Sequence, residues 1–291
     1  MRLIFFIALF FISCILSACA QSSDKIACYT YPRTTQSYKK KLWDGYEISL
    51  GPARNGSGGD GHDCTAAIYN AGGKVVFRTT GFGVIFDEDD TGEDFDGDGK
   101  PEVVFMTDTA GGAHCCWVRN VVSLWPKPHK LFDLGGGDIV KDKDGKMIIW
   151  QRVGGTTAYT SMANRPYAEQ AFRVRDGKLV DSTVEFCDKL FSPGSEDYDV
   201  WTRELTPANL ERLKSAKKIG IAAEYEIENI TSALLSRAMQ RVFCRQYDDA
   251  MADLNLWPEA GRADMKEQFA DSIKDSDPHF AAKMEEGSSS E

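Results

Sequence analysis

The stretch Asp94-Phe-Asp-Gly-Asp-Gly-Lys-Pro-Glu-Val-Val-Phe-Met106 places an acidic, glycine-containing loop directly before an apolar run. Carboxylates stand at positions one, three, five and nine of the loop, and the glycines allow the positive φ that a tight turn needs. Ca²⁺ takes roughly six to eight oxygen ligands. The spacing therefore predicts a calcium site formed by the side chains of Asp94, Asp96, Asp98 and Glu102 and the carbonyl oxygen of Lys100.

Two other interpretations of the loop differ in what they require. An EF-hand would need a bidentate carboxylate at its twelfth position, where this chain has Phe105, and the residues after Glu102 indicate a strand rather than a helix. The other interpretation is an acidic surface turn that binds no ion. Further carboxylates just upstream of the loop, at 87–90 and at Glu93, are consistent with it. Because such carboxylates repel one another at neutral pH, an ion in the loop is expected to stabilise the fold.

The loop resembles the repeats of integrin-type FG-GAP and bacterial VCBS propeller blades. In those repeats the motif Asp-x-Asp-x-Asp-Gly-x-x-Asp lies between two strands and the ion fixes the turn, whereas here Glu102 takes the place of the last Asp. The resemblance covers the loop alone. It implies a calcium ion and says little about the whole fold.

Apolar runs separated by turn-forming residues predict a β-rich region over 46–184. Gly-Lys pairs at 73–74, 145–146 and 177–178 stand between such runs, as hairpins require. The irregular spacing excludes a regular solenoid, and the region is short for a complete propeller. We expect an antiparallel domain, propeller-like or sandwich-like, with strands at 46–50, 65–69, 74–78, 83–86, 102–106, 120–125, 146–151, 169–175 and 178–181.

The C-terminal part has helical signals. Thr206-Pro207 offers an N-cap followed by proline at the first helical position, and leucines recur after it at helical spacing. Further helices are expected over 221–247, 248–256 and 260–273. The predicted fold class is therefore α+β, organised as a signal peptide (1–18), an N-terminal linker (19–45), a calcium-binding β domain (46–190) and a helical region (205–285).

The N-terminal residues predict export. Arg2 precedes an apolar run that is too short to span a membrane, which is typical of a secretory signal. Leu16-Ser-Ala-Cys19 resembles a lipobox, with Cys19 as the lipid attachment site, and Ala18-Cys-Ala20 fits an ordinary cleavage site. We expect a protein of the periplasm or cell envelope that meets a membrane only through a lipid anchor, with free secretion as the alternative.

The charge balance restricts the partners. The chain has 34 basic and 44 acidic residues and a formal net charge of −10. Such a field repels polyanions, so nucleic acid is not an expected partner. An acidic exported protein instead suits calcium, which is abundant outside the cell.

Six cysteines follow Cys19, and an even number in an oxidising compartment predicts disulfides among Cys28, Cys64, Cys115, Cys116, Cys187 and Cys244. Cys28 and Cys64 would join two nearby N-terminal segments, and Cys187 or Cys244 would tie the tail to the core. Adjacent residues of a strand point to opposite faces, so Cys115 and Cys116 are expected to meet different partners.

The segment Gly111-Gly-Ala-His-Cys-Cys-Trp117 is compositionally unusual and resembles bacterial exported proteins that carry a GGAHCC motif, a resemblance that implies no activity. Four interpretations stay open. In the first, the glycines permit a bulge and His114 makes a buried hydrogen bond. In the second, His62 and Cys64 join His114 and Cys115 or Cys116 around a transition metal, and in the third, His114 activates a cysteine thiolate. In the fourth, Trp117 helps to form a binding site.

The motifs of common hydrolases, zinc proteases, P-loop NTPases and c-type haem proteins are missing from the sequence. The expected role is a binding module for a protein or glycan of the cell envelope. The alternative is an envelope enzyme that uses thiol or metal chemistry around His114 and Cys115 or Cys116, and a structural partner in a larger assembly is a third class.

Overall fold

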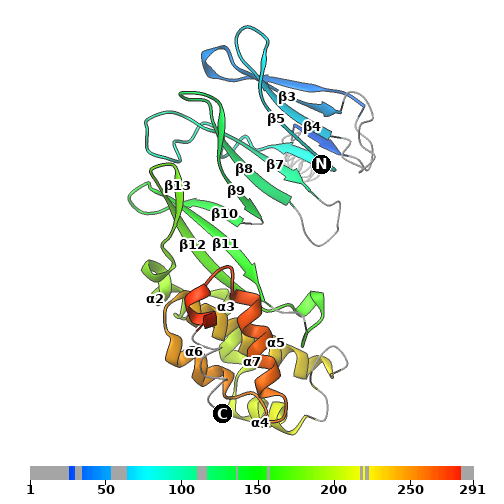
Figure 1. The fold of residues 1–291 in the computed structure, drawn as a ribbon, viewed down its shortest axis with the longest axis vertical. Helices are drawn as coiled ribbons and strands as arrows, with labels where there is room; N and C mark the ends of the chain where they lie inside the picture. Colours follow the sequence, from blue (N-terminus) through cyan, green and yellow to red (C-terminus); the bar gives the residue numbers. More distant parts are fainter. Residues whose placement is uncertain are drawn as a thin grey trace, which may run out of the picture. The chain divides into compact units, whose positions relative to one another are not determined.

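The computed structural model describes residues 26–29, 35–53, 64–109, 117–135, 137–155, 158–216, 219 and 223–282. These residues fall into two compact units: the first holds strands β1 to β8 and most of β9, and the second holds strands β10 to β13 and the α-helices (Figure 1). The prediction of a mixed α+β protein with antiparallel sheets is confirmed. The described residues form no closed barrel and no propeller.

The first unit contains two antiparallel sheets. One has the order β1-β6-β7-β8-β9, formed by β1 (Ala27–Tyr29), β6 (Gly83–Phe86), β7 (Val103–Asp108), β8 (Trp117–Ser123) and β9 (His129–Gly135). The other has the order β2-β3-β4-β5, formed by β2 (Tyr38–Lys41), β3 (Glu47–Pro52), β4 (Cys64–Tyr69) and β5 (Val75–Gly81), with a 3-10 turn η1 (Trp43–Gly45) between β2 and β3.

Both sheets contribute to one hydrophobic core. Ile48 and Ile68 from one sheet and Val103 and Phe105 from the other are fully buried in the same cluster. The disulfide between Cys28 on β1 and Cys64 on β4 joins the two sheets within this core, and it confirms the predicted pairing. The unit is therefore built as two layers that are covalently linked.

The second unit begins with a four-stranded meander, in which β10 (Gly137–Lys141), β11 (Met147–Gly154), β12 (Tyr167–Arg175) and β13 (Lys178–Asp181) pair in chain order. The β10–β11 turn is held by Asp142, whose Oδ1 accepts hydrogen bonds from the backbone N–H groups of Asp144 and Lys146, both at 2.9 Å. Gly145 has φ 76° there, so the Gly-Lys turn forms as predicted.

Helices follow the meander, starting with the 3-10 turn η3 (Thr183–Phe186); another, η2 (Met162–Asn164), precedes β12. The α-helices are α2 (Cys187–Leu190), α3 (Glu196–Glu204), α4 (Pro207–Ser215), α5 (Tyr225–Phe243), α6 (Tyr247–Leu254) and α7 (Arg262–Ile273). At the start of α4 the Thr206 hydroxyl accepts a hydrogen bond from the Asn209 N–H at 3.3 Å, which confirms the predicted cap.

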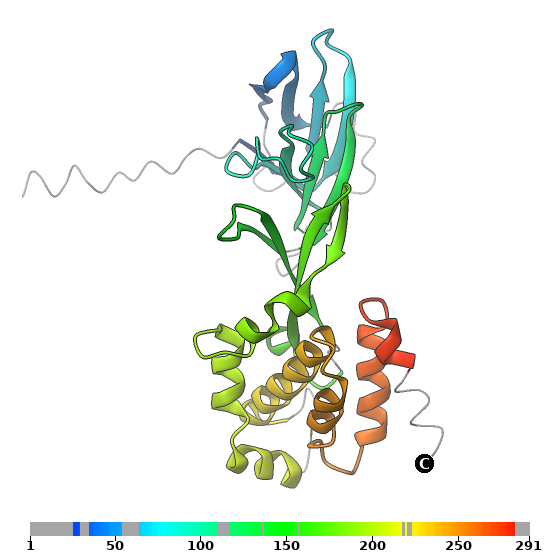
Figure 2. The same cartoon turned by 90° about the vertical axis from the view of Figure 1, so that its left-hand side faces the viewer.

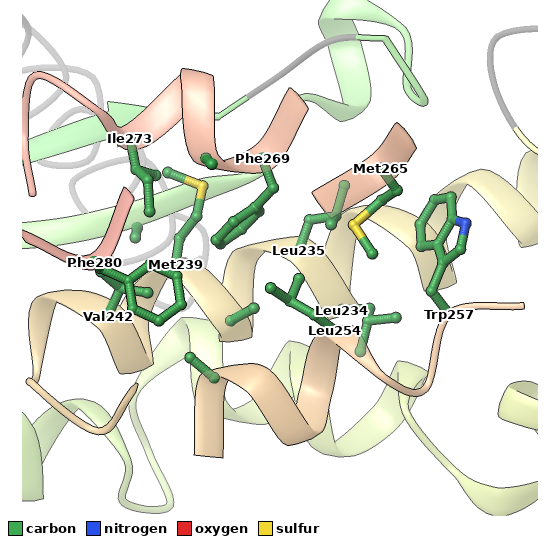
Figure 3. Close-up of a cluster of buried hydrophobic side chains, with 14 of the residues drawn as sticks. Leu234, Leu235, Met239, Val242, Leu254, Trp257, Met265, Phe269, Ile273 and Phe280 are labelled. Carbon is green, nitrogen blue, oxygen red and sulfur yellow. The ribbon is translucent and has the colours of Figure 1, made fainter. Parts of the chain in front are cut away.

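Helix α5 is the centre of the helical core. Figure 2 shows it with α6, between α3 on one side and α7 on the other. In Figure 3 the α5 residues Leu235 and Met239 lie on the side of Met265 and Phe269 of α7, and Leu234 lies beside Leu254 of α6; all six side chains are fully buried. Burial of each such side chain contributes about 1.5–3 kcal/mol, so this face of α5 stabilises the whole helical part.

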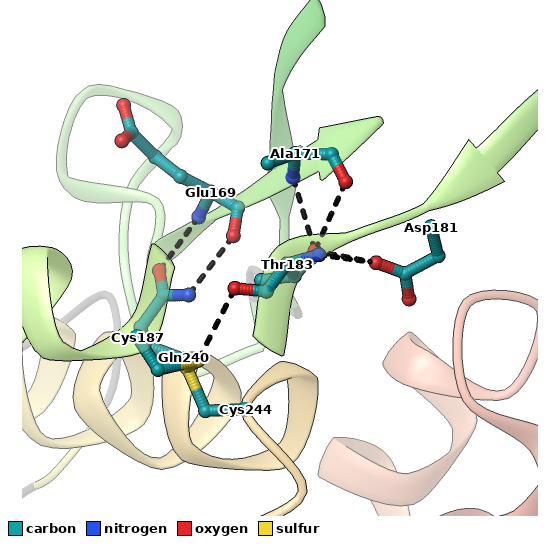
Figure 4. Close-up of a disulfide and its surroundings, with 7 residues drawn as sticks. All are labelled: Glu169, Ala171, Asp181, Thr183, Cys187, Gln240 and Cys244. Carbon is teal, nitrogen blue, oxygen red and sulfur yellow. Dashed lines mark hydrogen bonds between the residues drawn. A yellow bond between two sulfur atoms is a disulfide. The ribbon is translucent and has the colours of Figure 1, made fainter. Parts of the chain in front are cut away.

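A second disulfide joins Cys187, at the start of α2, to Cys244, at the C-terminal end of α5 (Figure 4). The sequence predicted that one of these cysteines ties the tail to the core, and the structure pairs them with each other. The bond fastens the segment after β13 to the central helix. Trp150 of β11 packs against the same cluster.

Several elements differ from the sequence-based expectation. Strands β1 and β2 lie inside the range 19–45 that was expected to be a linker, and β9, β10, α2 and α3 were not expected at all. Strand β2 has the sequence Tyr-Lys-Lys-Lys and is mostly exposed. With its ion pair between Lys39 and Glu47 (2.6 Å) it forms a charged edge strand, a position where lysine is common.

Candidate metal site

The acidic loop connects β6 to β7, and backbone hydrogen bonds close its base. The Glu102 N–H donates to the Glu93 carbonyl at 2.8 Å, and the Gly92 N–H donates to the Glu102 carbonyl at 2.9 Å. The Thr91 hydroxyl adds a bond to each backbone group of Val104, at 2.9 and 3.2 Å. The residues between are therefore presented as one closed turn at the start of β7.

The Asp94 carboxylate organises the turn from within. Its Oδ1 accepts a hydrogen bond from the Gly97 N–H at 2.7 Å, and its Oδ2 accepts one from the Gly99 N–H at 2.9 Å. The Asp98 N–H donates to Oδ1 of Asp96 at 3.0 Å. Gly97 and Gly99 have φ of 80° and 82°, so the bend uses the left-handed conformation that glycine adopts without strain.

The turn gathers three carboxylates. One oxygen from each of Asp94, Asp96 and Glu102 lies within 4.8 Å of the others. Asp94 is exposed, Asp96 is half-buried and Glu102 is fully buried, so the group runs from solvent to the start of β7. Carboxylates this close repel one another, and a buried carboxylate requires compensation by hydrogen bonds or by a cation.

The donor set of this group fits calcium. All three side chains offer oxygen and none offers nitrogen or sulfur, which is the chemistry that Ca²⁺ prefers over softer metals. A bound Ca²⁺ would be held by Asp94, Asp96 and Glu102, and its charge would turn their mutual repulsion into attraction. These are three of the four side chains that the sequence predicts as ligands.

The other two predicted ligands lie differently. The exposed carboxylate of Asp98 does not belong to the group of three. The ammonium group of Lys100 lies 5.1 Å from the centre of the Trp125 ring, so this side chain packs on the indole. The predicted contribution of Lys100 is its carbonyl oxygen, and that stays a prediction, as does a ligand role for Asp98.

The acidic segment upstream of the turn has its own counter-ion. Arg119 of β8 reaches Asp87 at 3.4 Å and Asp90 at 3.6 Å. Burial raises the pKa of Asp90, the charge of Asp87 raises it further, and the Arg119 guanidinium opposes both. The sequence reasoning missed Arg119, because nothing in its neighbourhood distinguishes it from any other arginine of a strand.

The GGAHCC motif lies outside the described residues, so the interpretations of His114, Cys115 and Cys116 stay predictions, as does lipid attachment at Cys19. Trp117, which follows the motif, starts β8 and meets Tyr29 edge-to-face with ring centroids 6.4 Å apart. A Cβ on Gly83 would stand 2.8 Å from the Trp117 ring, so this indole is packed closely. Cys64 is oxidised, which removes it from the proposed transition-metal ligands.

The chain as a whole fits export. The two disulfides among the described residues are typical of an oxidising compartment such as the periplasm or the extracellular space. Among the described residues no helix combines the length and hydrophobicity needed to cross a bilayer. Comparisons with protein-family models, with curated proteins and with solved structures give no match for the chain.

Proposed function

We propose that this protein is a calcium-stabilised, disulfide-bonded binding module of the cell envelope, with the ion held in the loop between β6 and β7. The observation that carries the proposal is the convergence of Asp94, Asp96 and Glu102, whose carboxylate oxygens lie within 4.8 Å of one another. The spacing of the loop sequence predicts these three residues among its five ligands. Geometry and sequence therefore support one site.

The proposed ion acts on the fold rather than on a substrate. Glu102 is fully buried at the entrance to β7, whereas Asp94 and Asp96 belong to the turn itself. A cation held by all three would fasten the turn to the strand. Because β7 is paired on both sides, by β6 and by β8, stabilising its start stabilises the five-stranded sheet.

The proposed partner is a protein or glycan of the envelope. Support comes from the two disulfides, which suit an exposed envelope protein, and from the acidic net charge of −10, which disfavours polyanions. An enzymatic role around His114 and Cys115 or Cys116 is the alternative function. A free, reactive thiol at either cysteine would favour it over the binding module.

Thermal unfolding with and without calcium tests the stabilising role. We expect calcium to raise the Tm of chelator-treated protein, since an ion that binds only the folded state stabilises it by about 2.7 kcal/mol at a hundred times Kd. Asp96→Asn should remove the shift. Asp89→Asn changes the same charge at an exposed aspartate outside the group of three, and it should keep the shift. An identical Tm in calcium and in chelator would contradict the proposal.

A further inference from the structure

The second unit contains a polar pocket of about 270 Å³. Its walls come from β11, β12, the segment around η2, α3 and α5. Helix α5 contributes Tyr225, Asn229, Ser232 and Ser236, which repeat every three or four residues and so share one face of the helix. This volume suits a small molecule rather than a macromolecular segment.

Arg165 has an unusual position on the pocket wall. Its Nε donates a hydrogen bond to the Gly155 carbonyl at 3.0 Å, and its Nη2 donates to the Gly154 carbonyl at 3.2 Å. No carboxylate of the described residues lies within 4.0 Å of its guanidinium. The half-buried charge is thus fixed in place by neutral acceptors, with N–H groups remaining for a ligand.

The backbone next to Arg165 is shaped to admit this guanidinium. A Cβ on Gly154 would stand 2.4 Å from Nε and 2.5 Å from Cζ of Arg165. An alanine at position 154 would therefore displace the guanidinium while leaving its charge in the chain. Gly154 ends β11, and its backbone does not have the positive φ that would itself exclude alanine.

The segment that leads into Arg165 is anchored to two helices. The Ser161 N–H donates to the buried carboxylate of Glu228 on α5. The Tyr159 hydroxyl donates to Asp264 on α7 and receives a hydrogen bond from Gln268 at 3.3 Å. The position of the Arg165 guanidinium is therefore defined by the fold around it rather than by a flexible loop.

Arg165 gives the pocket a positive group that pairs with neutral carbonyls rather than with a carboxylate, although the whole chain is acidic. Three arginines and two carboxylates line the pocket. Arg203 and Glu204 satisfy each other at 2.8 Å. Arg152 lies 3.7 Å from Glu169, which is not a lining residue, and its guanidinium stacks over the Tyr167 ring at 5.8 Å. The remaining carboxyl is Asp197, whose pKa is raised by burial and by Glu196, against the opposing charge of Arg152.

We propose that this pocket binds a small organic anion through its carboxylate or phosphate group, with Arg165 as the principal binding residue. A guanidinium fork matches both groups in geometry and charge. The side chains of Asn229 and Ser232 supply neutral hydrogen-bonding groups for the rest of the molecule. The site involves none of the calcium ligands, so its test is independent of the proposed metal function.

Calorimetric titration of the full chain with succinate, and separately with inorganic phosphate, tests the proposal in calcium-free buffer at constant ionic strength. We expect one molecule of at least one probe to bind at millimolar concentration or below. Preference for succinate would assign a carboxylate ligand, and preference for phosphate a phosphorylated one. Binding of neither probe at millimolar concentration would overturn the proposal.

The variants separate the Arg165 site from general attraction to a basic surface. Arg165→Gln and Gly154→Ala should each weaken binding by about tenfold or more. Arg175→Gln removes the same charge from an arginine of β12 outside the pocket and should leave binding unchanged. If Arg165→Gln does not fold, Ser232→Phe serves as a blocking variant that spares the Arg165 hydrogen bonds. Wild-type affinity in Gly154→Ala and in Ser232→Phe would contradict the assignment.

Discussion

The side-chain amide of Gln240 forms two hydrogen bonds with the backbone of Glu169 (Figure 4). The Glu169 N–H donates to Oε1 of Gln240 at 2.8 Å, and Nε2 of Gln240 donates to the Glu169 carbonyl at 2.9 Å. Strand β13 pairs with β12 only from Phe172 onward, so Glu169 lies beyond the end of that pairing. A side chain of α5 therefore hydrogen-bonds with the β12 backbone beyond the end of β13.

Side chains also form hydrogen bonds with this edge of β12 at two more positions. The Tyr167 N–H donates to the Ser236 hydroxyl at 2.9 Å, and the Ala171 N–H donates to the Thr183 hydroxyl at 3.0 Å. Four residues of helix rise about 6 Å and two residues of strand about 6.6 Å, so the spacing of Ser236 and Gln240 matches that of Tyr167 and Glu169. Side chains thus protect the strand edge from pairing with another chain.

Replacing Gln240 with leucine should destabilise the second unit. The fully buried amide would disappear and leave both backbone groups of Glu169 without these bonds, at a cost of about 1–3 kcal/mol for each group that stays unsatisfied. Urea unfolding followed by circular dichroism measures the change. Gln268→Leu removes only bonds between side chains, at Tyr159 and Asp264, and should cost less. Equal losses in the two variants would argue against the edge-capping role.

The disulfide between Cys187 and Cys244 should contribute strongly to stability. It closes a loop with a sequence separation of 57 residues, and loss of such a bond typically costs about 2–4 kcal/mol. The double variant Cys187→Ala with Cys244→Ala should show this loss in denaturant unfolding under non-reducing conditions. Adding reductant to the wild type should lower stability at least as much, because it also reduces the disulfide between Cys28 and Cys64. Unchanged stability in the double variant would show that the bond constrains little.

The Glu228 carboxylate should make stability depend on acid. Burial alone would raise its pKa, but hydrogen bonds from Ser161 and Asn164 outweigh burial and lower the pKa below the ordinary 4.5. A lowered pKa contributes stability above the ordinary value, and this contribution is lost as the pH falls through the folded-state pKa. Glu228→Gln should therefore be less stable than wild type near pH 7, with the difference shrinking as the pH falls below 4.5. Glu267→Gln on the exposed side of α7 is the control, and a Glu228→Gln difference that stays constant with pH would refute the assignment.

Leu234 should be a sensitive core position. It is fully buried on α5 between the other helices of the unit, and Leu→Ala substitutions at such positions cost about 2–5 kcal/mol through lost burial and a residual cavity. Val184→Ala, which truncates a side chain that is 56% exposed, should change stability by less than about 0.5 kcal/mol. Chemical denaturation gives both values. A small loss at Leu234 would mean that the helical core repacks around the missing atoms.

The sequence predicted the elements that have strong local signals. The cap at Thr206, the Gly-Lys turns and the strand Gly83–Phe86 all form where local chemistry placed them. Short or charged strands have no such signal: β1 has three residues, and β2 is mostly lysine, so only pairing with β6 and β3 makes them strands. In these two strands, pairing with neighbouring strands rather than local propensity determines the conformation.

The two candidate sites also differ in whether a local stretch of sequence could predict them. The proposed metal ligands Asp94, Asp96 and Glu102 lie in one continuous stretch, so their spacing alone predicted that their carboxylates converge. Arg165 gave no signal, because its proposed role depends on contacts made only in the fold: Gly154 lies 11 residues earlier on β11, and a pocket wall comes from α5, far along the chain. A site assembled from separate elements can be found only once the fold has brought them together.

Calorimetric titration of chelator-treated protein with Ca²⁺ tests the central claim most directly. We predict binding of one ion to the wild type, loss of binding in Glu102→Gln, and retained binding in Glu88→Gln, which removes the same charge from a glutamate paired with Lys40 outside the loop. Glu102 is the decisive position because it is the buried member of the group. No heat of binding in the wild type, or equal binding by Glu102→Gln, would contradict the account.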